Sequence, residues 1–274
     1  SEVIIGVYDD IYQMHSKHDT RFTGLPTGFT GLDVMISGLN KSDLILIAGR
    51  PGMGKTSFAL NIASNVGLKT DADVAVFSLE MSNPMIVSDK LRTGHLETEE
   101  WSRLAVSAQK LSGTSIYLDD TAGMTVAQMK AKLRRLKNLG LVIIDYLQLM
   151  TTGSRIDNRV QEISQITRSL KIMAKELNVP VICLSQLSRA AEQRQGHRPM
   201  LSDLRESGSI EQDADIVLFL FREDYYAEEE DDANKNTATC IVAKNRHGST
   251  GDVTIGWQGE YTRFSNVELY RDEQ

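Results

Sequence analysis

The sequence predicts an α/β fold with a mostly parallel sheet, flanking helices and a C-terminal β-hairpin. Three observations lead to this fold class. A glycine-rich phosphate-loop motif lies between an apolar, strand-like run and a helical pattern. Further apolar runs alternate with helical patterns, which is typical of parallel strands joined by crossover helices. Near the C-terminus, two strand-like runs are joined by a short turn, as in a hairpin.

Composition and length indicate an ordinary globular protein with one large domain, since 41% of the 274 residues are apolar and 24% are charged. No apolar run approaches the roughly 18 residues of a membrane span, and no signal-peptide layout is present, so we expect a cytoplasmic protein without membrane contact. Cys183 and Cys240 lie in apolar runs and are expected to be buried thiols. The net charge of −7 comes from residues 223–232, and the rest of the chain is neutral, so nucleic-acid binding is not excluded.

The N-terminal residues 3–14 have the apolar spacing of a short amphipathic helix. Polar residues follow, so we expect residues 1–23 to be a helix with its tether and residues 24–274 to be the main domain. Packing of this helix on its own domain and docking on another subunit are equal alternatives. A second helical pattern covers residues 29–36.

The phosphate-loop motif is the most specific signal in the chain. It matches G-x-x-x-x-G-K-[ST] without a mismatch and consists of Gly49, Arg50, Pro51, Gly52, Met53, Gly54, Lys55 and Thr56. Residues 44–48 before it form an apolar run, and residues 57–63 after it have helical spacing. This context favours a loop whose backbone N–H groups bind phosphate over a glycine turn that binds nothing. Lys55 should reach the β- and γ-phosphates, and the Thr56 hydroxyl should ligate Mg²⁺.

Three later apolar runs each end in a polar residue of chemical interest. They are residues 74–79 before Glu80, residues 141–144 before Asp145 and residues 181–185 before Gln186. Helical patterns at 126–136 and 163–177 separate these runs, which predicts parallel strands. Because ligands bind beyond the carboxyl ends of such strands, the three polar residues should share one edge of the sheet with the phosphate loop.

The four apolar residues before Asp145 make the Walker B pattern, in which the carboxylate orients magnesium, usually through water. Alone this pattern is weak, because any buried strand can end in Asp; beside a phosphate loop it is much stronger. Tyr146 follows Asp145, so the base cannot be an adjacent carboxylate, and Glu80 is the best candidate for activating the attacking water. Capping of residues 81–84 is the alternative role of Glu80.

Residues 189–208 form a long polar stretch directly after Gln186. It contains Arg189, Arg194, His197, Arg198 and Arg205. A stretch of this kind can transmit the nucleotide state to a phosphate backbone, although a mobile surface loop has the same composition. The helix start at residues 207–211 can add backbone donors for a phosphate.

Residues 239–243 and 252–257 are the strands of the terminal hairpin. Lys244 and Arg246 lie two apart on its first strand, so their side chains should leave on one face. They are either nucleotide contacts or solvated surface cations.

Five segments together closely resemble the DnaB-type replicative DNA helicases. They are residues 49–56, 77–81, 144–150, 184–187 and 203–215. The resemblance covers nearly the whole chain and implies a RecA-like P-loop NTPase motor domain, with residues 1–23 as the linker helix and tether before it. The family's N-terminal primase-interacting domain has no counterpart in the sequence.

The resemblance implies an ATP-hydrolysing DNA helicase that uses ATP and Mg²⁺. It also implies a homohexameric ring that moves along single-stranded DNA, binds ATP between its subunits and unwinds duplex DNA. A primase and a helicase loader are the partners that such a motor would have.

Residue roles follow from the same resemblance. Glu80 corresponds to the catalytic base, Asp145 to the magnesium carboxylate and Gln186 to the γ-phosphate sensor. Lys244 and Arg246 match the family's trans-acting hairpin motif, with Arg246 as the arginine finger.

The family's DNA-contacting loop is matched by Arg205, Glu206 and Gly208. Two other classes share the phosphate loop and Asp145: a RecA-like ATPase of recombination, and a ring regulator without helicase activity. Residues 203–215 and the N-terminal helix favour the helicase. A motor domain that serves chiefly as a binding module for a loader or primase is a third alternative.

Overall fold

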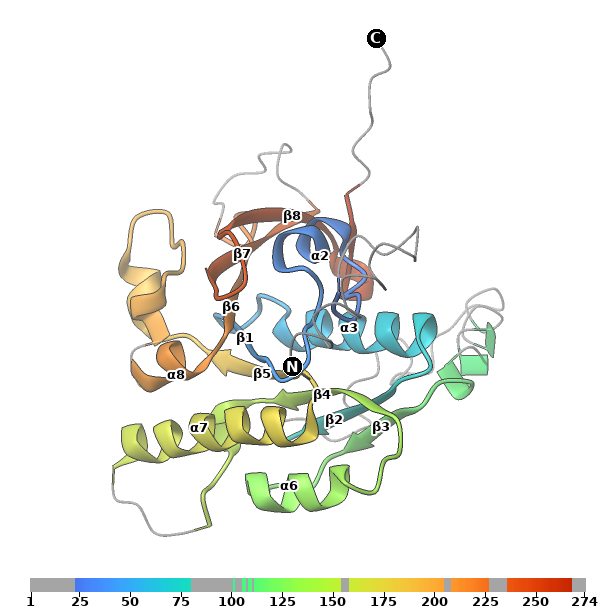
Figure 1. The fold of residues 1–274 in the computed structure, drawn as a ribbon. Coiled ribbons are helices and arrows are strands. Elements are labelled where there is room, and N and C mark those ends of the chain that lie inside the picture. Colours follow the sequence, from blue (N-terminus) through green and yellow to red (C-terminus); the bar gives the residue numbers. More distant parts are fainter. Residues whose placement is uncertain are drawn as a thin grey trace, which may run out of the picture.

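The computed structural model describes residues 23–79, 111–153, 158–204, 208–226 and 236–267, together with residues 101, 105–106 and 108–109. A nine-stranded sheet forms its centre (Figure 1). In spatial order the strands are β3 (Ile116–Asp119), β2 (Asp73–Ser78), β4 (Leu139–Asp145), β5 (Val181–Gln186), β1 (Leu44–Gly49), β6 (Ile216–Phe221), β7 (Thr237–Asn245), β8 (Gly251–Gln258) and β9 (Arg263–Asn266). The first six are parallel and the last three antiparallel, which confirms the mostly parallel sheet and the terminal hairpin.

Helices cover both faces of the sheet (Figure 1). One face carries α2 (Thr30–Ile36) and α3 (Lys55–Lys69), and the other carries α6 (Val126–Leu133), α7 (Arg159–Leu177) and α8 (Gly208–Asp213). Short 3-10 helices lie in the connections: η2 (Leu147–Leu149), η3 (Arg189–Gln193), η4 (Leu201–Leu204) and η6 (Gly259–Tyr261).

The central strands are buried on both faces, which explains their uninterrupted apolar runs. In β1, the side chains of Leu44 and Leu46 join the core under α6, α7 and α8, whereas Ile45 and Ile47 join the core under α2 and α3. All six residues of β1 are buried. The strand that leads into the phosphate loop is therefore fixed by packing from both sides.

The helix ends follow local signals. Thr125 and Gln128 form a capping box at the start of α6. The Asn158 side chain accepts the Val160 N–H at 2.9 Å at the start of α7, and Asn178 ends that helix in the left-handed region. Both helices lie where the sequence patterns predicted them, but α7 begins at Arg159, before its predicted range, and α6 ends at Leu133, before the end of its own.

Several predicted features lie outside the described residues. They are the N-terminal helix at 3–14, Glu80, Arg205 and Glu206. The thiols of Cys183 and Cys240 are buried and free, as the apolar runs around them indicated. Within the described residues, no helix has the length and apolar character needed to span a membrane.

Candidate active site

The carboxyl ends of neighbouring parallel strands gather the candidate nucleotide residues. Gly49 at the end of β1 is paired in register with Gln186 at the end of β5. Ser78 of β2 is paired with Asp145 at the end of β4, and the N–H of Leu79 donates to the Asp145 carbonyl at 2.6 Å. The phosphate loop, Asp145 and Gln186 thus lie at one edge of the sheet. Leu79 is the last described residue before the one predicted to be the base.

The phosphate loop has a backbone that suits its glycines. Gly52 and Gly54 have φ angles of 82° and 86°, a region that residues with a Cβ rarely adopt. A Cβ on Gly54 would also lie 2.9 Å from the ring of Phe264. Met53 between them is buried in the core and anchors the loop, so the backbone N–H groups around it are held in place at the start of α3.

The side chains that follow the loop converge on oxygen ligands. The Thr56 hydroxyl donates to Oδ2 of Asp145 at 2.7 Å, and Asp145 is 4% exposed. Lys55 Nζ lies 3.2 Å from the carbonyl oxygen of Arg50, so this side chain folds back over the loop. A hydroxyl beside a carboxylate fits Mg²⁺, which prefers hard oxygen ligands and shares them with substrate phosphates. Among the described residues no group of three or more His, Cys, Asp or Glu side chains could hold a metal, so an ion here would also need phosphate or water oxygens.

A cleft of about 340 Å³ opens over these groups. Its lining includes Gly52, Lys55, Thr56, Asp145, Gln186 and Trp257. Trp257 comes from β8, far along the chain from the loop, and was not singled out from the sequence. The alternation of buried Val253, Ile255 and Trp257 along β8 was the available signal.

Gln186 is oriented by a second glutamine that sequence reasoning also missed. The Gln148 side chain, on η2, donates to the hydroxyl of Ser185 at 3.0 Å and to the carbonyl of Gln186 at 3.3 Å. Its Oε1 accepts the Gln186 N–H at 3.4 Å. The exposed side chain of Gln186 therefore starts from a backbone tied to the Asp145 side of the cleft.

Arg50 ties the phosphate loop to the segment that follows Gln186. Its Nη2 lies 2.7 Å from Oε1 of Glu192 on η3, and its Nη1 donates to the carbonyl of Leu187 at 2.8 Å. The Arg50 side chain is 11% exposed, so this contact is largely shielded from water on the arginine side. Glu192 was not predicted to take part in the site.

The described part of residues 189–208 contains two short 3-10 helices, η3 and η4, and two ion pairs. Arg194 binds both carboxylate oxygens of the buried Asp203, at 2.9 and 3.1 Å, and this hydrogen bonding raises the pKa of Arg194. Arg198 pairs with Asp252 on β8 at 2.6 Å. Two of the candidate phosphate contacts, Arg194 and Arg198, are therefore engaged by carboxylates of this chain. Gly208 begins α8.

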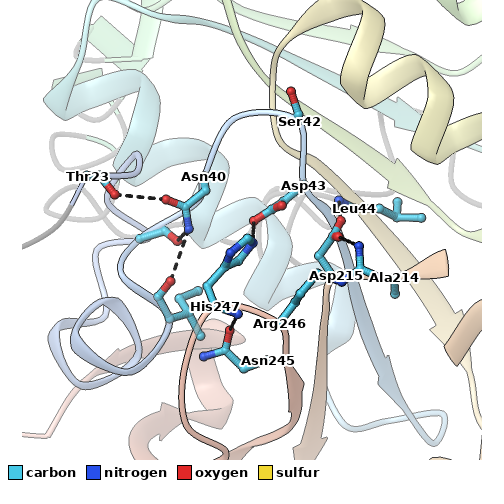
Figure 2. Close-up of polar contacts among 12 residues, drawn as sticks. Thr23, Asn40, Ser42, Asp43, Leu44, Ala214, Asp215, Asn245, Arg246 and His247 are labelled. Atoms are coloured by element: carbon cyan, nitrogen blue, oxygen red, sulfur yellow. Dashed lines mark hydrogen bonds and ion pairs between the residues drawn. The ribbon is translucent and has the colours of Figure 1, made fainter. Parts of the chain in front are cut away.

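The hairpin cations both contact the segment between α8 and β6. Lys244 Nζ donates to the carbonyls of Glu211 and Ala214 at 2.5 and 2.7 Å, and burial lowers its pKa. Arg246 Nη1 lies 2.9 Å from Oδ1 of Asp215 (Figure 2). Lys244 lies on β7 as predicted, whereas Arg246 directly follows the end of this strand at Asn245; both side chains reach residues 211–215.

Arg246 lies at the edge of the sheet opposite to the phosphate loop. It follows Asn245, which pairs with Ile216 at the start of β6, and Ile216 pairs with Ile45 near the start of β1. The phosphate loop leaves the other end of β1. A strand of this length separates its two ends by roughly 17 Å, so Arg246 does not reach the phosphate loop of its own chain.

Comparison with known proteins gives a consistent result. Residues 24–266 match the family model described as the DnaB-like helicase C terminal domain. Over 287 residues the chain is 51% identical to the replicative DNA helicase DnaB of Geobacillus stearothermophilus and 50% identical to the replicative DNA helicase DnaC of Bacillus subtilis (strain 168). Each match covers 99% of this chain and 63% of the relative, so the chain spans less than two thirds of these relatives.

Solved structures agree with the sequence relatives. A solved ATPase domain superposes with a TM-score of 0.90 at 41% identity, covering 97% of this chain and 98% of that one. A DnaB-like replicative helicase, described together with its interactions with primase, gives 0.87 at 42% identity over 97% of this chain and 66% of that one. The RadB recombinase, at 18% identity and a TM-score of 0.58, covers 89% of this chain and shares the fold alone.

Proposed function

The chain belongs to the family of DnaB-like helicase C-terminal domains, and we propose that it is the ATP-hydrolysing motor of a replicative DNA helicase. In this proposal it moves along single-stranded DNA and unwinds duplex DNA. The observation that carries the proposal is the cleft in which Lys55, the Thr56–Asp145 pair and Gln186 meet over the phosphate loop. The relatives that are named replicative helicases, at 42–51% identity, support the helicase, whereas the recombinase shares the fold alone.

ATP is the proposed substrate of this cleft. The loop N–H groups and Lys55 bind its β- and γ-phosphates, and Glu80, next in sequence to Leu79, deprotonates the attacking water. Bound Mg²⁺ would neutralise phosphate charge, with Thr56 and Asp145 as its protein ligands, directly or through water. Gln186 senses the γ-phosphate in this proposal, which is supported by its pairing with Gly49 of the loop and by its place in the cleft that Asp145 also lines.

The proposed homohexameric ring comes from the likeness to the replicative helicases, and the position of Arg246 supports an active site shared between two subunits. The side chain of Arg246 is 54% exposed and lies at the opposite edge from its own phosphate loop. A neighbour whose loop faces that edge would receive Arg246 beside its γ-phosphate, where an arginine stabilises the charge of the transition state. Lys244 would accompany it. Residues 1–23, as the linker helix, would dock on the adjoining subunit, while residues 24–274 form the motor.

DNA binding is assigned to Arg205, Glu206 and Gly208, just before and at the start of α8. The contact between Arg50 and Glu192 supports a link from the phosphate loop to the segment that leads there. Single-stranded DNA would be held through its phosphates. A primase and a helicase loader are the proposed protein partners, in the cytoplasm; a relative of known structure is described with primase.

The test is a measurement of ATP hydrolysis with and without single-stranded DNA, beside unwinding of a forked duplex. We expect DNA to stimulate hydrolysis and the fork to open only with ATP. Glu80→Gln should bind ATP and lose turnover by about a hundredfold or more, whereas Glu176→Gln, on α7, serves as the matched control. If single-stranded DNA did not change the rate of ATP hydrolysis and the forked duplex stayed closed, the helicase function would be contradicted and a ring regulator favoured.

A further inference from the structure

Arg246 is held at two points by one residue. Its guanidinium Nη1 lies 2.9 Å from Oδ1 of Asp215, and its backbone N–H donates to the carbonyl oxygen of Asp215 at 2.9 Å. Figure 2 shows Asp215 and Arg246 next to each other. Asp215 directly precedes β6, and Arg246 directly follows β7. Because both ends of the arginine are tied to the same residue, the place of Asp215 determines the place of the guanidinium.

Asp215 is itself fixed by the core. Its side chain is 2% exposed. Oδ2 accepts the N–H of Leu44, the first residue of β1, at 2.8 Å, and it also binds the ammonium of Lys171 on α7. The N–H of Asp215 donates to the Leu44 carbonyl at 2.9 Å. The carboxylate therefore has a single defined orientation between a central strand and a helix.

The contact leaves most of Arg246 able to act elsewhere. Its side chain is 54% exposed, and among the described residues its guanidinium contacts Asp215 through Nη1. A guanidinium has five N–H donors in a rigid plane, so one anchored nitrogen still leaves donors for phosphate oxygens. An arginine with one edge anchored and the other exposed loses less rotamer freedom when a phosphate arrives.

Charge makes Asp215 more than a hydrogen-bond acceptor. Lys171 and Arg246 bind the two oxygens of one carboxylate, and Lys171 is only 14% exposed. Without the negative charge of Asp215, Lys171 and the nearby Lys244 would repel Arg246, while Asp43 would remain as an anion beside Lys171. The exposed one, Arg246, is free to move away. We propose that Asp215 is the positioning residue that aims Arg246 at the neighbouring subunit, an inference that rests on the proposed arginine-finger role of Arg246.

Asp215→Asn tests this proposal, because the amide keeps the shape and an acceptor for the Leu44 N–H but loses the charge. We expect kcat for ATP to fall roughly 10- to 100-fold, the effect of misplacing a catalytic group by about 1 Å. KM for ATP should change less than about threefold, since the cleft of each subunit is intact. A kcat of Asp215→Asn equal to that of the unmodified chain would overturn the proposal.

Mixed rings locate the defect. Asp215→Asn subunits keep their own cleft, so Glu80→Gln subunits, which supply a good Arg246, should restore activity when co-assembled with them. Arg246→Ala subunits should not, because every interface would then have a defective finger. A merely structural defect in the cleft of Asp215→Asn would give the reverse pattern, and that result would reject the positioning role.

Two controls separate the possible failures. Arg246→Ala mixed with Glu80→Gln must regain activity; if it does not despite co-assembly, the proposed trans finger fails. If it does while Asp215→Asn departs from the expected pattern, only the present inference fails. Asp43→Asn is the matched variant, because Asp43 is a second buried carboxylate at this edge and pairs with His247 at 2.8 Å (Figure 2).

Asp43→Asn should keep kcat within about threefold, since Asp43 binds the neighbouring turn residue and not Arg246. If Asp43→Asn lost as much kcat as Asp215→Asn and was rescued by the same partner subunits, the effect would belong to the turn as a whole. That result would overturn the specific role of Asp215. If Asp215→Asn does not form rings, Asp215→Glu replaces it: the charge stays, the carboxylate moves by one methylene, and rescue by Glu80→Gln but not by Arg246→Ala is again expected. The opposite rescue would reject the proposal here too.

Discussion

The hydroxyl of Thr56 donates a 2.7 Å hydrogen bond to the carboxylate of Asp145, although the two residues are 89 positions apart in the chain. Thr56 lies in the first turn of α3, after β1, and Asp145 ends β4, with β5 between the two strands. The sheet therefore brings together a hydroxyl and a carboxylate that fit the ligand preference of Mg²⁺.

Asp145→Asn should raise the Mg²⁺ concentration needed for half-maximal ATP hydrolysis by roughly 10- to 100-fold, the usual cost of disturbing a metal's supporting ligands. The amide still accepts the Thr56 hydrogen bond but offers no charge to the ion. A Mg²⁺ titration of the hydrolysis rate measures the effect. Asp33→Asn, which changes another buried carboxylate on α2, should leave the titration unchanged. Equal curves for Asp145→Asn and the unmodified chain would remove Asp145 from the metal site.

Lys55→Ala should abolish ATP hydrolysis, because it removes the cation that faces the β- and γ-phosphates. Lys69→Ala, in the last turn of the same helix, is the matched control and should hydrolyse ATP normally. Steady-state hydrolysis of both variants is the measurement. Substantial turnover by Lys55→Ala would contradict the assignment of the phosphate loop.

Glu192→Gln should uncouple DNA from hydrolysis, because it weakens the ion pair that joins the phosphate loop to the segment before α8. We expect the stimulation of hydrolysis by single-stranded DNA to fall at least about fivefold, the lower range of measured couplings between sites. The free energy of unfolding should change by less than about 1 kcal/mol, because Glu192 is partly exposed. Arg198→Ala is the control: it changes a residue of the same segment and breaks the ion pair with Asp252 on β8. DNA should still stimulate ATP hydrolysis in this variant. Unchanged stimulation in Glu192→Gln would rule out this connection.

Arg205→Ala should weaken binding of single-stranded DNA at every sequence. Because binding to phosphates releases counterions, the salt slope of the affinity should fall by roughly 0.7 for each phosphate that the variant no longer neutralises. Fluorescence titrations at several salt concentrations measure both, with Arg168→Ala on the exposed side of α7 as control. ATP binding should persist. An unchanged salt dependence of the affinity would show that Arg205 does not contact DNA phosphates.

Deletion of residues 1–16 should shift the protein toward monomers and make hydrolysis depend steeply on protein concentration, since separated subunits cannot supply Arg246 to one another. Light scattering beside hydrolysis measures both effects, and deletion of residues 268–274 is the length control. A truncated chain that remains hexameric would show that the linker helix is not needed for assembly.

The sequence alone determined the features that depend on neighbours in the chain. The phosphate loop is recognisable because a strand, a glycine turn and a helix follow one another within some twenty residues. The buried strands and the stripe of α7 are visible because burial imposes a period on adjacent residues. The edge shared by Gly49, Asp145 and Gln186 also followed from sequence, since parallel strands place their carboxyl ends together.

Only the tertiary structure decided which distant side chains meet. The sequence predicted the hairpin of β7 and β8, but Trp257 lines the cleft only because β7 pairs with β6 and so joins this hairpin to the central sheet. Arg50 meets Glu192, and Arg194 meets Asp203, through the path of residues 187–204. From its place in the sequence, Arg246 was either a nucleotide contact or a solvated surface cation. The register of β6 with β7 puts it beside Asp215, at the far edge, because strand pairing is a long-range choice that composition and spacing do not encode.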